Sequence, residues 1–115
     1  MVELVRHGPK RATAGLMLAY ERSGEPVPEP GWLTVFLDGA GAPRVIVRTI
    51  WTDVRPFSQV DAAFAWDEGE SDRSLADWQL DHRQYFGRAC ASMGLDSDEQ
   101  MLVILERFEL VWPIG

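Results

Sequence analysis

The sequence predicts an α+β fold, in which a small β-barrel or curled sheet is packed against helices. Three stretches rich in β-branched or aromatic residues, 32–37, 44–53 and 103–112, are predicted to be strands. Two stretches with helix-capping signals lie between the second strand and the third. A chain of 115 residues, 46% of them hydrophobic, is expected to form one domain with a packed core.

The N-terminal part predicts a helix over residues 13–23. This stretch contains alanine, leucine and methionine with few β-branched residues, Thr13 can cap its start, and Gly24 can end it. The alternating prolines of PVPEPGW cannot continue a helix, so we expect an extended connector into the strand at 32–37.

The turn signal DGAG at 38–41 separates the first two predicted strands. Because glycine-rich turns join neighbouring antiparallel strands, residues 32–37 and 44–53 are expected to pair as a hairpin.

Two helices are predicted before the last strand. One runs over 58–67, with Ser58 and Asp61 at capping-box spacing, and the other over 74–93, opened by Ser74. The second helix places one stripe of mostly apolar side chains at three-to-four spacing: Leu75, Trp78, His82, Tyr85, Phe86 and Ala89.

His82 lies on that stripe and allows two interpretations. It could be a ligand or acid–base residue, or it could be a hydrogen-bonded histidine packed between Trp78 and Tyr85. Because such stripes commonly form a core, the second interpretation is preferred.

Net charge limits the classes of partner. With a formal charge of −7, the chain is not expected to attract polyanions in general, so any RNA binding must be local. The single Cys90 cannot form an internal disulfide and the N-terminus lacks the pattern of a secretion signal, so a cytoplasmic protein without a membrane partner is expected. Lys10 is the only lysine beside ten arginines, and a lysine amine, unlike a guanidinium, can be tuned to lose its proton.

The segment LVRHGPK at residues 4–10 suggests one alternative function. In histidine phosphatases a similar segment supplies a phosphoryl-accepting histidine and a phosphate-binding arginine, which would be His7 and Arg6 here. The chain is short for such a fold, and LDHRQYF around His82 does not resemble the second histidine site of those enzymes. We therefore expect His7 to be a turn residue.

Four segments resemble the ASCH domain, the activating signal cointegrator homology fold of the PUA-like superfamily, and in particular the small bacterial ASCH proteins of the YhfF type. The segments are GPKRATAGL, LDGAGAPRVIVRTIWTDVRPFSQV, FAWDEGESDRSLADWQLDHRQYF and VILERFELV. The resemblance runs from Leu4 to Trp112, and Gly8, Lys10 and Thr13 match the motif Gly-x-Lys-x-x-Thr. Relatives usually carry a further N-terminal helical segment, so the resemblance implies a single ASCH domain over residues 1–115 that lacks part of that segment.

The resemblance implies a β-barrel shared with the PUA domains of RNA-modifying enzymes, and a cleft that binds RNA or nucleotides. Some small bacterial ASCH proteins are amidohydrolases that deacetylate N4-acetylcytidine with a Lys, a Thr and a Glu. Carried over by position, these residues are Lys10, Thr13 and Glu68. The arginine that follows the threonine in the deacetylases is replaced by Ala14-Gly15-Leu16, so substrate recognition is expected to differ.

Two mechanisms are open for these residues. Thr13 could be the nucleophile with Lys10 as its base, or Lys10 could stay charged and support the oxyanion while Glu68 activates Thr13 or a water. In both, the N-terminus of the predicted helix at Thr13 would contribute backbone donors.

A small nucleoside or single-stranded RNA is the expected ligand, with no cofactor and no metal. Gly8, Trp66, Arg48 and Arg73 are the expected substrate-binding residues. The contrasting hypothesis is a non-catalytic PUA-like module that binds RNA or a nucleotide in a basic, aromatic-lined cleft, for which the candidates are Arg44, Arg48, Arg55 and Arg73.

Two further groups have structural interpretations. The acidic stretch at 67–72 is expected to be a solvated turn rather than a metal site. Four tryptophans could stack on a base, but for each one alone a place in the core is the better interpretation: Trp32, Trp51, Trp66 and Trp78.

Overall fold

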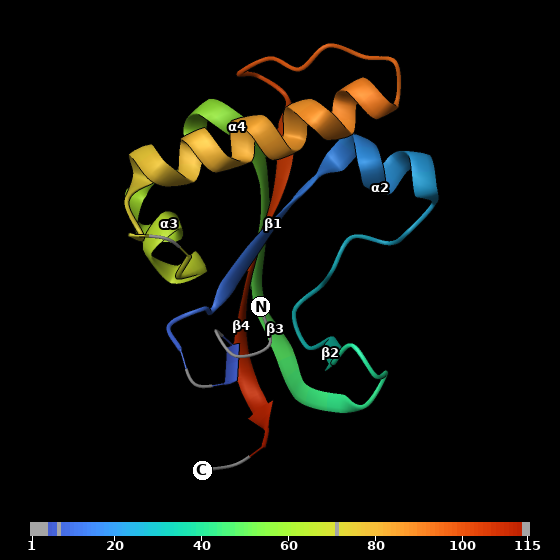
Figure 1. The fold of residues 1–115 in the computed structure, drawn as a ribbon, viewed down its shortest axis with the longest axis vertical. Helices are drawn as coiled ribbons and strands as arrows, with labels where there is room; N and C mark the ends of the chain where they lie inside the picture. Colours follow the sequence, from blue (N-terminus) through green and yellow to red (C-terminus); the bar gives the residue numbers. More distant parts are fainter. Residues whose placement is uncertain (1–4, 7, 71, 114–115) are drawn as a thin grey trace.

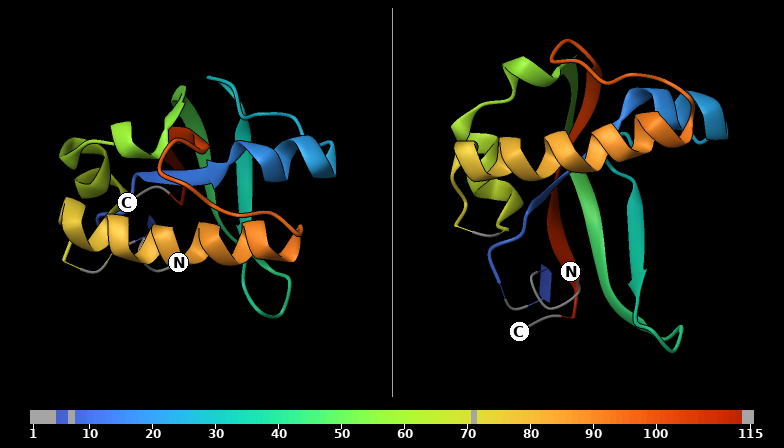
Figure 2. Two further views of the ribbon diagram at one scale, coloured as in Figure 1. Left: turned by 90° about the horizontal axis from the view of Figure 1, so that it is seen from above. Right: turned by 45° about the horizontal axis from the view of Figure 1, so that its top comes forward.

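The computed structural model describes residues 5–6, 8–70 and 72–113. They form one antiparallel sheet that curls into a half-barrel, with helices gathered at one end (Figures 1 and 2). The strand order is β1-β4-β3-β2, so the two long strands are central and the two short ones are the edges. The strands are β1 (Ala12–Leu16), β2 (Leu33–Leu37), β3 (Pro43–Pro56) and β4 (Leu102–Trp112). The predicted α+β class with a curled sheet is confirmed.

The helices that lie wholly within the described residues are α2 (Met17–Ser23), the short 3-10 helix η1 (Phe57–Gln59), α3 (Ala62–Glu68) and α4 (Leu75–Ser92). Helix α4 lies across one end of the long strands, beside α2, and α3 lies near the other end of α4 (Figure 2). Of the helices in the described part of the chain, none has the length and apolar character needed to cross a bilayer.

The predicted hairpin is confirmed. Strands β2 and β3 pair antiparallel, and Asp38 in the turn accepts hydrogen bonds from the backbone N–H groups of Ala40 and Ala42 at 2.9 and 3.0 Å. The bonds from Ala42 and Ala40 hold the pKa of the Asp38 carboxyl below its usual range. The turn is therefore built around this aspartate.

The helix predicted over 13–23 is wrong in its first half. Residues 12–16 form strand β1, which pairs with β4, and helix α2 begins at Met17 with no side-chain cap. Pairing with the edge of β4 buries Ala12 and Leu16 in the core, and this tertiary contact overrides the helical propensity of the segment. The end of the helix is as predicted, with Gly24 in the left-handed conformation at φ 74°.

The later helices differ in how well their starts were predicted. Helix α3 starts four residues late, because Asp61 and not Ser58 is its cap, accepting a bond from the Phe64 N–H at 2.9 Å. Helix α4 begins as predicted, with the Ser74 hydroxyl accepting from the Asp77 N–H at 3.1 Å. The last strand also matches its prediction within one residue.

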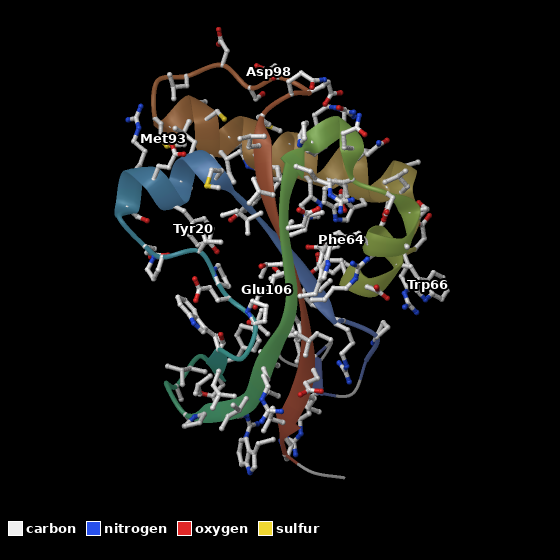
Figure 3. All side chains as sticks on the ribbon, turned by 180° about the vertical axis from the view of Figure 1, so that it is seen from behind. Tyr20, Phe64, Trp66, Met93, Asp98 and Glu106 are labelled. Atoms are coloured by element: carbon white, nitrogen blue, oxygen red, sulfur yellow. The ribbon has the colours of Figure 1, made fainter. Side chains whose placement is uncertain are left out.

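The core is divided into two clusters. The larger lies between α4 and the sheet and includes Phe57, Trp78 and Phe86, whereas a smaller one lies toward the other end of the long strands. Of the four tryptophans expected in the core, only Trp78 is buried. Trp32 and Trp66 are 39% and 56% exposed, and Figure 3 shows Trp66 at the outer surface while Phe64 points toward the sheet.

Candidate functional site

The segment before β1 is anchored between α3 and β4. The backbone N–H of Arg11 donates to the Asp67 carbonyl at 2.7 Å, and the Phe108 N–H donates to the Arg11 carbonyl at 3.0 Å. Gly69, the left-handed C-cap of α3 at φ 70°, faces the backbone of Lys10 so closely that an added Cβ would lie 2.8 Å from the Lys10 nitrogen. The end of α3 is therefore pressed against Lys10.

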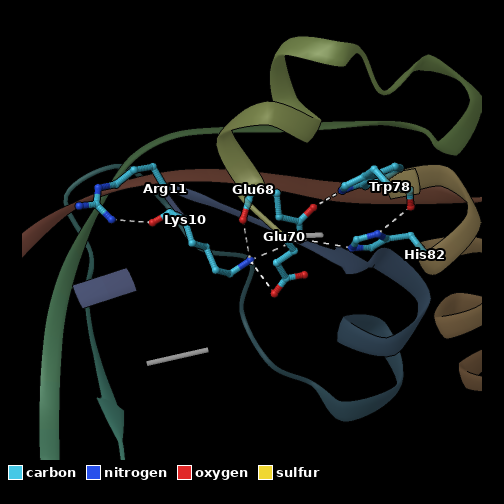
Figure 4. A network of polar contacts seen from close by, with 6 residues as sticks. All are labelled: Lys10, Arg11, Glu68, Glu70, Trp78 and His82. Carbon is cyan, nitrogen blue, oxygen red and sulfur yellow. Dashed lines mark hydrogen bonds and ion pairs between the residues drawn. The ribbon is translucent and has the colours of Figure 1, made fainter. Parts of the chain in front are cut away.

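Lys10 is 1% exposed, and its amine lies among oxygens of the α3 end (Figure 4). The Nζ donates to the Glu68 carbonyl at 3.3 Å and lies 3.7 Å from Glu68 Oε1 and 3.4 Å from Glu70 Oε1. Because a buried ammonium is costly unless it is paired, these oxygens keep the amine inside the protein. Lys10 and Glu68, 58 residues apart, thus form a buried ion pair.

The Glu68 carboxylate, 3% exposed, also binds two residues of α4. Its Oε2 accepts a hydrogen bond from the indole Nε1–H of Trp78, and its Oε1 lies 3.2 Å from Nε2 of His82. Three nitrogen groups from two parts of the chain therefore surround this carboxylate (Figure 4).

His82 is hydrogen-bonded and packs on Trp78, as the preferred interpretation predicted, but its second aromatic neighbour is Phe86 and not Tyr85. Its ring stacks on Trp78 with centroids 4.2 Å apart and is tilted against Phe86 at 5.6 Å, whereas Tyr85 is 59% exposed. Its Nδ1 lies 2.9 Å from the Trp78 carbonyl. Burial by itself lowers the pKa of His82, but the hydrogen bond and the charge of Glu68 outweigh it and raise the pKa above 6.5.

These groups open into a cleft of about 440 Å³ at the β1 edge of the sheet. It is lined by side chains from β1 and the residues just before it (together called the β1 segment, residues 8–16), from the end of α3 and from one face of α4. These are Lys10, Thr13, Ala14, Glu68, Glu70, Asp81, His82, Gln84, Tyr85 and Arg88. All three predicted catalytic residues thus line one cleft.

Thr13 reaches this cleft from a strand and not from a helix terminus. The backbone donors expected there from a helix N-terminus are therefore absent, because α2 begins at Met17. In the described part of the chain, no hydrogen bond joins Thr13 to Lys10 or Glu68. The close contacts are those of Lys10 with Glu68.

Sequence reasoning missed one wall of the cleft. Four of its residues lie on α4 at three-to-four spacing: Asp81, Gln84, Tyr85 and Arg88. Tyr85 was already noted on the apolar stripe, and the polar residues Asp81, Gln84 and Arg88 beside it were the available signal.

None of the four predicted substrate-binding residues is among the described residues that line this cleft. Arg48 pairs with Glu109 at 2.6 Å on the sheet surface. Arg73 lies over the Trp66 ring at 3.6 Å and donates to the Trp66 carbonyl, so these two form a separate surface pair. Gly8 also lies outside the lining.

Three of the four arginines proposed for a basic cleft are paired with acids. Arg44 lies 3.4 Å from Asp38, and Arg55 lies 2.5 Å from Asp53. With Arg48 and Arg73 engaged as described above, these four arginines do not form a common basic surface around the cleft.

The acidic stretch divides among several partners. Asp67 pairs with Arg107 at 2.9 Å, Glu70 faces Lys10, and Asp72 accepts the Ser74 N–H. Within residues 5–6, 8–70 and 72–113, no three His, Cys, Asp or Glu side chains are arranged to hold a metal ion. His7, the residue of the phosphoryl-transfer alternative, lies outside the described residues.

Glu106 is a second buried carboxyl group that the sequence analysis did not single out. It lies on β4 directly opposite Thr13 of β1, is 9% exposed, and accepts a hydrogen bond from the Thr49 hydroxyl at 2.6 Å. Burial raises the pKa of Glu106, and the bond from Thr49 counters it in part. Burial and the nearby Glu106 charge also raise the pKa of Tyr20.

The Glu106 carboxyl predicts a loss of stability as pH rises. Because its folded pKa lies above the ordinary value of 4.5, its contribution is complete below that value and is lost as pH rises through the folded pKa. Glu106→Gln keeps an acceptor for Thr49 without the charge. We therefore expect the free energy of unfolding of the variant, relative to wild type, to be higher at pH 8 than at pH 5. Urea unfolding at both pH values measures this gain, with exposed Glu109→Gln as the control. An equal difference at the two pH values would contradict it.

The half-barrel sheet with helices at one end is the fold of a PUA-like domain. The sequence model of the ASCH domain family matches residues 1–112, and the chain belongs to this family. A crystal structure of an ASCH domain from Lactobacillus crispatus is similar, with a TM-score of 0.87 and 38% identity over 95% of this chain and 69% of the other. A crystal structure of a protein from Enterococcus faecalis has a TM-score of 0.85 and 31% identity over 96% of this chain and 66% of the other.

The chain thus spans about two thirds of the length of these two solved proteins. A search of curated proteins gave no match. The predicted ASCH resemblance is confirmed by the family match and by both structures.

Proposed function

We propose that this protein hydrolyses the acyl amide of an N-acylated cytidine nucleoside, with Lys10, Thr13 and Glu68 as its working residues. The observation that carries the proposal is the buried Lys10–Glu68 pair at the wall of a cleft that Thr13 also lines. Buried, paired ionisable groups at the wall of a cleft are typical of catalytic sites.

In the proposed reaction, the Thr13 hydroxyl oxygen attacks the acyl carbonyl carbon and the carbon–nitrogen bond to the base breaks. The Thr13 proton passes through a water to Glu68 and then to the leaving amine, while the Lys10 ammonium pairs with the oxyanion. Each carboxylate oxygen has two lone pairs, so Glu68 can still accept a proton while bound to Trp78 and His82. Water then hydrolyses the ester on Thr13, which releases the carboxylic acid and restores the hydroxyl.

The cleft favours a small, uncharged ligand over a long RNA. Its volume of about 440 Å³ lies within the range of small-molecule sites. It presents the carboxylates of Glu68, Glu70 and Asp81 against the cations of Lys10 and Arg88, which disfavours a phosphate chain. The exposed ring of Tyr85 offers a stacking surface for a base.

The alternative is a non-catalytic module that binds a nucleoside in the same cleft. The observation that favours it is the position of Thr13, which makes no hydrogen bond to Lys10 or Glu68 within the described residues. Binding needs only the cleft, whereas catalysis needs this threonine to reach the acyl carbon.

The test is release of cytidine from N4-acetylcytidine by the purified protein, followed by chromatography. Thr13→Val keeps the shape of the side chain and the preference for a strand but removes the hydroxyl, so we expect turnover to fall at least about 10³-fold while the fold is kept. Thr34→Val, at an exposed position of strand β2, is the matched control and should keep full turnover. A folded wild-type protein without turnover would favour the binding module, and turnover retained by Thr13→Val would exclude Thr13 as nucleophile.

A further inference from the structure

We propose that His82 is a positioning residue of this site, which is held as an imidazolium and, by donating a proton to Glu68, fixes the carboxylate that pairs with Lys10. The part of this inference that concerns turnover rests on the proposed function. The part that concerns the proton rests on the geometry and the charges around the ring and does not depend on turnover.

The two ring nitrogens of His82 both face acceptors. Nδ1 lies 2.9 Å from the Trp78 carbonyl, which can only accept, so this nitrogen carries a proton. In a neutral ring, Nε2 would then carry a lone pair and no proton, so it could only accept a hydrogen bond. It lies 3.2 Å from Oε1 of Glu68, however, and a carboxylate oxygen is also only an acceptor. A second proton, shared between Nε2 and Oε1, is needed to make this contact a hydrogen bond.

The ring cannot avoid this contact by a small rotation. It stacks on Trp78 at an interplanar angle of 15° and also contacts the Phe86 ring, with centroids 5.6 Å apart. The same Trp78 supplies the carbonyl for Nδ1 and the indole N–H for Glu68. Trp78 therefore orients both members of the His82–Glu68 pair.

The surrounding charges support a proton on His82. Glu68 from α3, Glu70 after α3 and Asp81 of α4 line the cleft beside it, against Lys10 from the β1 segment and Arg88 of α4. These five groups sum to one negative charge at neutral pH, and an imidazolium balances it.

Loss of this proton would disturb the site. Without it, two lone pairs face each other, so Glu68 must turn away from His82 while only Trp78 and Lys10 still hold it. Since the folded pKa of His82 lies above 6.5, its stabilising contribution is complete below that value and is lost as pH rises through the folded pKa. Stability and turnover are both expected to fall on this alkaline side.

The direct test is the NMR titration of the histidine rings in the wild-type protein. The chain has two histidines, so His82→Gln assigns the two signals by loss of one. We expect His82 to titrate above 6.5 and its midpoint to fall in Glu68→Gln, which removes the charged acceptor. The matched control Glu109→Gln, an exposed carboxylate paired with Arg48, should leave the midpoint unchanged. A wild-type midpoint at or below 6.5 would overturn the proposal even if Glu68→Gln failed to fold.

The pH dependence of turnover is the second readout and tests the positioning role of His82. The variant His82→Gln is suited to it because the glutamine amide can donate to Glu68 without titrating. We expect the alkaline fall in turnover to disappear in His82→Gln, and turnover to be low at all pH values in His82→Leu. An unchanged pH profile in His82→Gln would overturn the positioning role. A protein without any turnover would contradict the proposed function and leave the NMR titration as the test of the shared proton.

Discussion

Replacing Lys10 by methionine (Lys10→Met) is expected to lower the free energy of unfolding by about 3 kcal/mol, the scale at which a buried ion pair loses one partner. The amine is enclosed by Glu68 and Glu70, and methionine keeps most of the apolar stem but leaves these carboxylates with less compensation. Under the proposed function, turnover of N4-acetylcytidine should also fall about 100-fold or more, because the oxyanion loses its cation. Denaturant unfolding and the cytidine assay measure the two effects.

Arg48→Met is the matched control for this change. Its ion pair with Glu109 is shorter, at 2.6 Å, but both side chains are nearly half exposed, so its loss should cost less than about 1 kcal/mol. Equal losses in the two variants would show that burial does not set the strength of the Lys10 pair. Normal turnover in Lys10→Met would remove Lys10 from the proposed mechanism.

Gly69→Ala should destabilise the protein far more than Gly24→Ala, although both glycines are left-handed helix C-caps. At Gly24 an added Cβ meets nothing within 4 Å, so the cost is the backbone strain of about 1–2 kcal/mol. At Gly69 the same Cβ would lie 2.8 Å from backbone atoms of Pro9 and Lys10, which cannot move without breaking the contacts of the β1 segment. We expect the Gly69 variant to lose about 3 kcal/mol more than the Gly24 variant.

Thermal unfolding of both variants side by side measures this difference. Both alanines have the same left-handed backbone strain, and only the one at position 69 contacts the backbone of Pro9 and Lys10. Similar losses would contradict the packing of α3 against Lys10. Under the proposed function, Gly69→Ala should also reduce turnover of N4-acetylcytidine, because the added Cβ pushes on the backbone of Lys10.

The elements that sequence patterns predicted well are those with strong local signals. The hairpin followed from its turn at 38–41, and helix α4 followed from its cap at Ser74. Strand β1 was missed because residues 12–16 are mostly small and lack the alternation of a strand, and their conformation is decided by pairing with residues 103–107. Local propensity carries no information about such a distant partner.

The candidate site was predictable only in part. The resemblance supplied Lys10, Thr13 and Glu68, and the structure brings all three to one cleft. The contact of His82 with Glu68 depends on how α3 packs against α4, which no spacing in the sequence encodes. Arg48 and Arg73 were chosen by charge alone, and charge does not reveal that acids or an aromatic ring already engage them.

The strand order has a consequence for how the protein is made. Strand β1 carries Thr13 and follows Lys10, yet it pairs only with β4, the last strand of the described chain. During synthesis the ribosome must therefore release residues 102–112 before the N-terminal strand finds its partner. Until then the nascent chain can form the β2–β3 hairpin and helix α4, but the segment with Lys10 and Thr13 has no strand to pair with.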